Sequence, residues 1–480
     1  MPRWFPIFSR RRKLRLKTPL LPGAALIAAC ASTVALGDTT GLTGSGLPFD
    51  NLQPSLAVTE ALPLYGIYPS RSGGGSASGD MLGFVYDFAG NFAPGGSLAA
   101  QGQLLSINQN TALFSLLGTT YGGNGTTTFA LPNLQGTATL GVGTGVGLST
   151  QTLGAATGSA SVILSTTQIP PHDHTLPGGG VTGSTGGGQP FGNVQPSLPL
   201  HTLIATSGIF PSSGGGGGSA AFIGQVATFA GNFAPAGWAD ANGQLLSIAS
   251  NTALFSILGT TYGGDGVTTF ALPDLRGRVA VGADANNPLG STFGEELATL
   301  TDSQLPGHDH TLPGGGVTGI TGGGQPVTND QPSLALNYLI AINGIFPSRD
   351  IGPGFDIDNP ILGQITEFAG NFAPSGWAFA DGQLLSIAQN TALFAILGTQ
   401  YGGNGITNFA LPDLRGRTLV GTGFDFFAGE AFGADANTLT VANLPAHDHS
   451  LSSTVPEPGT IALLGVALSG LGFSRRRKLH

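Results

Sequence analysis

The chain of 480 residues repeats one unit three times. The heptapeptide FAGNFAP begins at Phe88, Phe229 and Phe368, a spacing of about 140 residues. Each copy is followed, in the same order, by GQLLSI, NTALF, YGGNG or YGGDG, FALPNL or FALPDL, and an HDH triplet. Solenoid and propeller repeats have periods of about 20–50 residues. The longer period therefore predicts three tandem domains.

Each unit is expected to be rich in β-structure. LGFVYDFAG, IGQVATFAG and LGQITEFAG have the β-branched and aromatic content of strands, bounded by glycine-rich turns. The chain holds 80 glycines, yet 40% of its residues are hydrophobic and only 9% are charged. Such a composition favours a buried core of short strands joined at glycine turns over a disordered chain.

One short helix and one tight turn are predicted in every unit. In NTALFSLLG, Asn110 would cap the helix, Leu113, Leu116 and Leu117 would share one face, and Gly118 would end it. The glycines of YGGNG are expected in a turn with positive φ, because no lysine or helix start follows as in a phosphate-binding loop.

The repeated unit resembles a known domain. The stretch from FAGNFAPAGW to FALPDLRGRVAVG, residues 229–282, is similar to the phage tail collar domain, in particular that of bacterial microcystin-dependent proteins. The resemblance implies a tail-fibre-like, β-rich, non-enzymatic domain. It also implies that the H-x-H pairs of three subunits can bind a metal on a three-fold axis. We predict a mainly β protein with short helices, built from three tandem phage-tail-collar-like domains.

One segment is displaced relative to that family. The family places QPSLxLNYxIAxxGIFPS after the H-x-H pair, as happens here from Gln195 and Gln331, but the third copy, from Gln53, lies near the start of the mature chain that the expected cleavage would leave. Two arrangements stay open. Either the N-terminal segment completes the third repeat and closes a pseudo-three-fold ring without an orphan edge strand, or the repeats are beads that each keep the segment before them.

The repeats and the terminal patterns define the expected domain boundaries. These are residues 1–37 (signal peptide), 38–72 (N-terminal segment), 80–176, 221–312 and 360–451 (collar repeats), 177–220 and 313–359 (linkers with a QPSL segment), and 455–480 (sorting signal with a transmembrane helix).

Six of the eight histidines lie in the HDH triplets. In an extended segment, residues i and i+2 face the same side, so each triplet would present two imidazoles together. Neutral imidazole is a common ligand of transition metals, and we name Zn or Fe as the candidate cofactor. One shared site of six nitrogens, three separate sites and a purely structural role all stay open. The candidate ligands are His172, His174, His308, His310, His447 and His449.

Two repeats carry an LRGR tetrapeptide directly after an aspartate. Its arginines, Arg276 and Arg278 in the second repeat and Arg415 and Arg417 in the third, are expected to pair with the aspartate in a turn. Binding of an acidic sugar is the weaker alternative. The first repeat has LQGT instead, from Leu134, so a ligand that needs these arginines would not bind there.

The N-terminus has the pattern of an export signal. Seven basic residues within the first 17 precede the apolar stretch PLLPGAALIAACASTVALG. This order predicts a signal peptide cleaved near Ala35 or Gly37. A retained anchor is the alternative, but the apolar run is short and interrupted by proline. The only cysteine, Cys30, lies in this stretch, either as a lipidated residue or as one of its apolar residues, so no internal disulfide is expected.

The C-terminus consists of a VPEP motif (Val455, Pro456, Glu457, Pro458), an apolar stretch over residues 460–473, and a basic cluster. This order resembles the PEP-CTERM sorting signal of Gram-negative bacteria. The resemblance implies a helix that enters the inner membrane, basic residues that stay in the cytoplasm, and an exosortase-type enzyme that acts at the motif. The protein is therefore expected in the cell envelope, at the cell surface or outside the cell, with membrane contact only through its terminal signals.

Charge and missing catalytic groups limit the function. Between Asp38 and Ser450, six arginines face 25 acidic residues, a net charge of −19 that opposes binding to nucleic acid or anionic membranes. The sequence shows no nucleophile with a matching base, so an enzyme is not expected. We predict an exported, non-enzymatic structural or adhesive protein that is handled by the sorting enzyme and whose further partners are either surface polysaccharide or other copies of itself. The alternatives are a receptor-binding fibre of a phage-tail-like particle, opposed by the export signals, and a polysaccharide-modifying enzyme.

Overall fold

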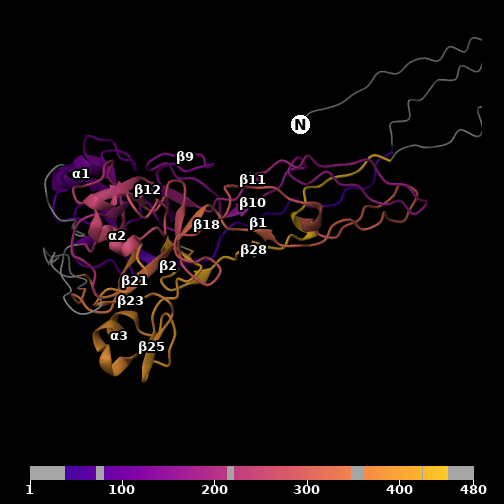
Figure 1. The fold of residues 1–480 in the computed structure, drawn as a ribbon. Helices are drawn as coiled ribbons and strands as arrows, with labels where there is room; N and C mark the ends of the chain where they lie inside the picture. Colours follow the sequence, from indigo (N-terminus) through magenta and orange to yellow (C-terminus); the bar gives the residue numbers. More distant parts are fainter. Residues whose placement is uncertain (1–37, 72–80, 213–220, 348–359, 424, 452–480) are drawn as a thin grey trace, which may run out of the picture. The chain divides into compact units, whose positions relative to one another are not determined.

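The computed structural model describes residues 38–71, 81–212, 221–347, 360–423 and 425–451 (Figure 1). The predicted signal peptide and the VPEP motif with its apolar stretch lie outside these residues. Within them the chain is mainly β with three short α-helices, which confirms the predicted fold class. No helix of the described part is long and apolar enough to cross a membrane.

The repeats contain nearly the same elements. The N-terminal segment forms β1 (Phe49–Asp50) and β2 (Ser55–Pro63). The first repeat and the segment after it form β3 (Phe84–Phe88), β4 (Ser97–Ala99), β5 (Leu104–Ser106), η1 (Ile107–Gln109), α1 (Thr111–Leu117), β6 (Thr128–Ala130), β7 (Ala138–Gly141), β8 (Gly143–Thr144), β9 (Thr150–Gln151), β10 (Ser161–Val162), β11 (Phe191–Gly192) and β12 (Ser197–Ala205). The second set comprises β13 (Gln225–Phe229), β14 (Trp238–Asp240), β15 (Leu245–Ser247), η2 (Ile248–Ser250), α2 (Thr252–Leu258), β16 (Thr269–Ala271), β17 (Val279–Gly282), β18 (Thr292–Phe293), β19 (Leu297–Ala298), η3 (Asp302–Gln304), β20 (Val327–Thr328) and β21 (Ser333–Ala341). The third comprises β22 (Gln364–Phe368), β23 (Trp377–Phe379), β24 (Leu384–Ser386), η4 (Ile387–Gln389), α3 (Thr391–Leu397), β25 (Asn408–Ala410), β26 (Thr418–Gly421), β27 (Ala431–Phe432), β28 (Ala436–Asn437) and η5 (Val441–Asn443).

The predicted helix forms in every repeat. In α1, Leu113, Leu116 and Leu117 are buried, and Gly118 ends the helix with φ of 56°. The predicted cap is wrong: the side chain of Asn110 makes no capping bond to the helix and donates backwards to the carbonyl of Ser106 instead. That bond joins the helix to β5 and η1, which precede it.

Three long strands connect the repeats. The first half of β12 pairs in parallel with β7, and its second half pairs with β13 and β14 of the next repeat. Strand β21 joins β17 to β22 and β23 in the same register. Strand β2 joins β26 of the third repeat to β3 and β4 of the first. The segment around Gln53 thus makes with the third repeat the pairings that the other two copies make with theirs.

The first strands of the three repeats also pair with one another. Residues at one end of β3 pair with β13, residues at the start of β13 pair with β22, and residues at the start of β22 pair with β3. The contacts therefore run from the first repeat to the second, the second to the third, and the third to the first. All three repeats lie in one compact unit.

A second set of contacts joins the repeats at the ends of β7, β17 and β26, and a glycine makes each of these junction contacts. Gly141 pairs with Arg276, Gly282 with Arg415, and Gly421 with Gln135. An added Cβ would lie 1.9, 1.8 and 2.2 Å from the carbonyl oxygens of the neighbouring Leu275, Leu414 and Leu134. Only glycine has room for so close an approach of two backbones.

A buried ring of hydrogen bonds joins the three QPS segments. The backbone N–H of Gln53 donates to the side chain of Gln195, that of Gln195 to Gln331, and that of Gln331 to Gln53, over 3.0–3.1 Å. Each glutamine is at most 2% exposed. Because each side chain satisfies the backbone of another segment, the three segments depend on one another for their buried polar groups.

A cluster of acidic residues is buried beside the paired first strands. Glu60 on β2 lies opposite Asp87 on β3, and Glu367 lies on β22. Glu60 is 3% exposed, and neither of its carboxylate oxygens has a hydrogen-bond partner in the described part of the chain. Burial and mutual repulsion raise the pKa of Glu60 and Asp87 well above the usual range, and burial raises the pKa of Glu367 to about 7.

Glu60→Gln is expected to stabilise the protein at pH 8. A carboxyl whose pKa is raised by folding stabilises the folded state at low pH, and this contribution is lost as the pH rises above the carboxyl's ordinary pKa of about 4.5 and through its raised pKa in the folded state. At pH 8 the variant should gain about 1–3 kcal/mol in free energy of unfolding. At pH 4.5 the gain should be small. Urea denaturation at both pH values measures this. The exposed Asp302→Asn variant is the control, and an equal gain at both pH values would contradict the account.

Candidate metal centre

Each HDH triplet lies in an extended segment that pairs with a neighbouring one. His172 exchanges two backbone hydrogen bonds with Thr185, and the N–H of Thr182 donates to the carbonyl of His174. The extended backbone turns both histidines inwards and the intervening Asp173 outwards. The same holds in the other triplets, where the histidines are at most 4% exposed.

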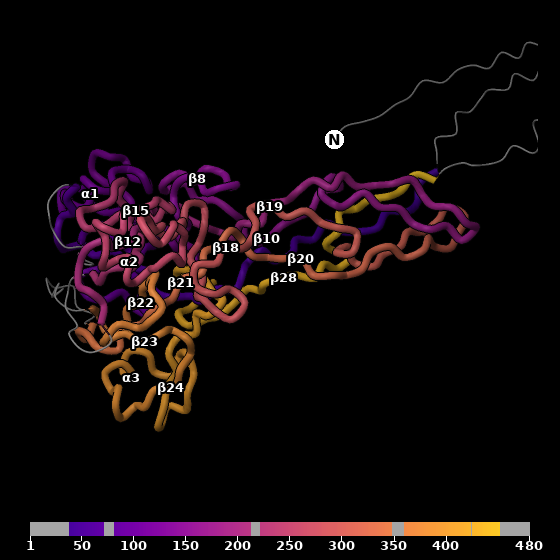
Figure 2. Tube along the Cα trace, in the orientation of Figure 1, coloured from indigo at the N-terminus to yellow at the C-terminus, as the bar shows by residue number. Residues whose placement is uncertain are grey.

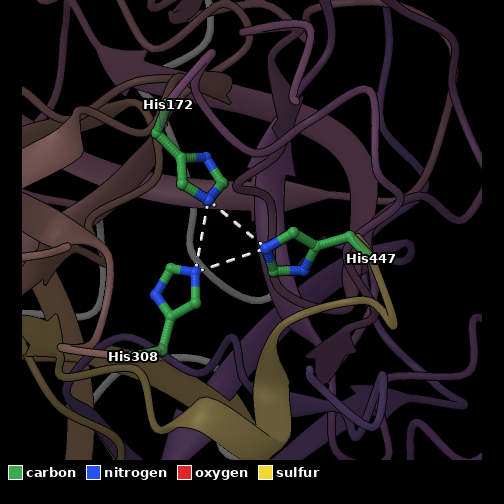
Figure 3. Close-up of side chains that lie close together, drawn as sticks. All are labelled: His172, His308 and His447. Atoms are coloured by element: carbon green, nitrogen blue, oxygen red, sulfur yellow. Dashed lines mark hydrogen bonds between the residues drawn. The ribbon is translucent and has the colours of Figure 1, made fainter. Parts of the chain in front are cut away.

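The three triplets come together. The Nε2 atoms of His172, His308 and His447 lie 3.2–3.3 Å from one another, and Figure 3 shows the three rings pointing at a common centre. Segments far apart in the sequence thus meet at one place. Figure 2 shows magenta, orange and yellow segments running along the same part of the molecule.

The second histidines of the triplets form another layer. The ring centroids of His174, His310 and His449 lie 4.7–4.8 Å apart. Each ring of the first layer contacts two rings of the second: His172 contacts His174 and His449, for example, at 5.4 and 4.8 Å. His308 and His447 make the equivalent contacts with their own neighbours. The two layers are therefore staggered, as the two triangular faces of an octahedral ligand set are.

Backbone carbonyls fix the protonation of all six rings. In the first layer, Nδ1 of each histidine contacts the carbonyl of the proline two residues before it, at 2.9–3.0 Å. In the second layer, Nδ1 of His174, His310 and His449 contacts the carbonyls of Gly319, Gly41 and Gly183, at 2.8–2.9 Å. A carbonyl only accepts, so every Nδ1 must carry the proton, and in a neutral ring Nε2 then carries a lone pair.

Burial favours the neutral form of five of these six rings. Burial, reinforced by the neighbouring imidazoles, lowers the pKa of His172 and His310 to about 4 and that of His308 to about 3. Burial also lowers the pKa of His447 and His449. The short Nε2–Nε2 contacts therefore join lone pairs, with no proton between them. The Nε2 atoms of His174, His310 and His449 are buried without a partner in the described residues.

This donor set fits a transition-metal ion. Groups of three histidines that combine both layers have ligand atoms within 4.8 Å of one another. An octahedral ion with bonds of about 2.1 Å to imidazole nitrogen holds neighbouring ligand atoms about 3.0 Å apart. That spacing is close to the 3.2–3.3 Å of the first layer. Carbonyls on Nδ1 are the usual outer partners of metal-bound histidine. The six histidines can thus hold a metal ion.

The ends of the described chain meet at this centre. Gly41 supplies the carbonyl for His310, and the Thr40 hydroxyl accepts from the backbone N–H of His449. Thr39 forms a bridge with Ser450. The sequence pattern HDH revealed the ligands but not Gly41, Gly183 and Gly319, because a carbonyl partner leaves no mark in side-chain identity. Their only signal is the VTG or TTG tripeptide in which each lies.

The predicted arginines lie elsewhere, at the repeat junctions. Arg276 donates through Nε and Nη2 to both carboxylate oxygens of Asp274 at 2.9 Å, and Arg415 pairs in the same way with Asp413. Arg278 and Arg417 contact the same aspartates at 3.7 and 3.9 Å. These ion pairs stabilise the turns whose residues Arg276 and Arg415 pair with the junction glycines.

The predicted sorting motif, residues 455–458, lies outside the described part of the chain.

Comparison with known proteins agrees with the repeats. The model of the phage tail collar domain matches residues 83–139, 224–280 and 363–419. The model of the PEP-CTERM protein-sorting motif matches residues 454–478. Searches of curated proteins and of solved structures found no match. The chain thus carries three phage tail collar domains and ends in a PEP-CTERM sorting motif.

Proposed function

We propose that this protein is a non-enzymatic adhesive component of the cell envelope, sorted by an exosortase-type enzyme and directed at surface polysaccharide. The observation that carries the proposal is the combination of collar domains, which are structural modules, with a sorting motif on the same chain. The motif implies export and processing, and the collar repeats supply an acidic body.

We further propose that the body is a closed pseudo-trimer around one Zn or Fe ion. One cyclic order links the repeats in three sets of contacts: the pairings of β2, β12 and β21, the junction glycines, and the glutamine ring. This order supports a closed arrangement of the three repeats. The convergence of six imidazole lone pairs supports the ion. When bound, the metal would neutralise the repulsion between these lone pairs and hold three distant segments together. All six nitrogen ligands would come from the protein, which leaves no open position for chemistry on the metal.

Fractionation and attachment assays test the proposal. The chain is expected in the envelope or medium, and deletion of Pro456, Glu457 and Pro458 should retain it at the inner membrane. Cells that lack the protein should attach less to polysaccharide-coated surfaces, and the full chain, but not the deletion variant, should restore attachment. Unchanged localisation of the deletion variant would refute sorting, and unchanged attachment of the null strain would refute adhesion.

A further inference from the structure

Each of the three repeat junctions contains a hollow at an equivalent place. The hollow between the first and second repeats has a volume of about 220 Å³, and that between the second and third about 180 Å³. The hollow between the third and first has about 480 Å³. Only the third falls in the range of about 300–1,000 Å³ that is usual for small-ligand sites.

The three hollows differ in charge. Arg276 and Asp240 line the first, and Arg415 and Asp381 line the second. The third has no charged residue in its lining. Gln135 takes the place of the arginine there, so the long side chain that packs along Gly143 in the first hollow is missing.

Phenylalanines from a short loop line the enlarged hollow. The third repeat has Phe426 and Phe427 where the second has Asn287 and Pro288. Phe426 stacks on Phe432 with ring centroids 4.0 Å apart and an interplanar angle of 15°. Phe427 is 71% exposed, although its backbone is fixed: its N–H donates to the Glu430 carboxylate at 3.0 Å, and Gly429 donates to the carbonyl of Ala57 at 2.8 Å. Because these hydrogen bonds already hold the loop backbone, the aromatic face of Phe427 is available to a ligand with little further loss of backbone entropy.

Amide groups line the same hollow. Gln400 uses its Nε2 to donate to the carbonyl of Ala89 at 3.1 Å, which fixes the side chain and orients its amide. The side-chain amides of Gln101 and Gln135 make no hydrogen bond to the described residues. Each uncommitted amide can donate twice and accept through its oxygen.

We propose that the hollow between the third and first repeats binds one unit of an uncharged saccharide, with a sugar face against Phe427 and hydroxyls on Gln101, Gln135 and Gln400. Sugar hydroxyls both donate and accept, as amides do, while the C–H face of a pyranose packs on an aromatic ring. A charged ligand would find no residue of opposite charge in this lining. The assignment deepens the proposed polysaccharide adhesion and rests on it.

An array of uncharged and acidic oligosaccharides, probed with the purified full chain, tests the site. Binding to uncharged members is expected, and Phe427→Ala and Gln135→Ala should each weaken it at least about tenfold. Gln135→Arg, which restores the residue of the other junctions, should also abolish it by filling the hollow. Ile406→Ala, at a side chain 83% exposed on the same repeat, is the control and should bind as the parent does. Equal unfolding temperatures of all variants exclude misfolding.

Three results would overturn the assignment in distinguishable ways. If uncharged oligosaccharides still bind to the Phe427→Ala and Gln135→Arg variants, the hollow is not their binding site, although the proposed adhesion to polysaccharide is not refuted. Binding only to acidic members would refute the ligand class and point to the arginine-lined junctions. Absence of binding to any member would refute both the hollow and the polysaccharide partner, while envelope sorting would be judged separately by fractionation.

Discussion

Replacing His308 by alanine is expected to remove the bound metal and to lower the stability of the whole body. His308 belongs to the layer whose Nε2 atoms lie 3.2–3.3 Å apart, so its loss opens one face of the site. An ion whose free concentration is about a thousand times its dissociation constant stabilises the folded state by about 4 kcal/mol. That contribution would disappear in the variant. Calorimetry should show a lower unfolding temperature for His308→Ala and for the parent after treatment with a chelator.

The control is His201→Ala. His201 contacts Asp240 at 3.0 Å in the first junction hollow and lies outside the six-histidine cluster. Its metal content should equal that of the parent, and a chelator should lower its unfolding temperature by the same amount. A chelator without effect on the parent, or His308→Ala with full metal content, would show that the triplets serve packing alone.

Gly421→Val is expected to destabilise the protein as strongly as Gly141→Val and Gly282→Val. In a closed arrangement the three junctions are equivalent, and at each one a side chain would meet a carbonyl oxygen within about 2 Å. Overpacking of this kind costs about 1–3 kcal/mol and can cost more when backbone must move. Denaturant unfolding of the three variants measures the effect, with the largest losses visible as failure to fold.

Gly192→Val is the matched control for these variants. An added Cβ at Gly192 has no atom within 4 Å, so the free energy of unfolding should change little. If Gly421→Val is as stable as the parent while the other two junction variants unfold, the third repeat does not contact the first, and the repeats are an open row of beads.

The sequence predicted those features that side-chain identity encodes. The repeat period, the buried leucines of the short helices, the positive φ of Gly122, Gly123 and Gly125, and the arginine–aspartate pairs could all be expected from local patterns, and the structure has them. Each depends on residues close together in the chain. The cap at Asn110 was wrong because Asn110 has two backbone groups within reach, and the carbonyl of Ser106 competes with the helix N–H groups.

Features that depend on contact between repeats could not be predicted in this way. The carbonyls that fix the second histidine layer come from other segments, up to 269 residues away. The junction glycines resemble ordinary turn glycines in sequence, and only the opposite backbone shows why they cannot carry a side chain. Glu60 and Glu367 each lie on an unremarkable strand, and their shared burial appears only when three strands pair around one centre.

A single chain also allows the three repeats to differ. A homotrimer repeats every side chain three times, whereas here one junction has Gln135 and a phenylalanine loop and the other two have arginine. The histidine centre keeps the three-fold pattern, and the enlarged hollow departs from it. A scaffold that is held together by one shared metal site, and that binds its ligand at only one junction, would require this combination of a symmetric centre and an asymmetric surface.

The metal content of the monomeric chain decides whether its six histidines form one metal site. Native mass spectrometry of the purified protein, with elemental analysis to identify the metal, gives the number of ions per chain and the number of chains per particle. One transition-metal ion is expected in a particle of one chain. Three ions per chain, or one ion shared by three chains, would contradict a site built by the six histidines of a single chain.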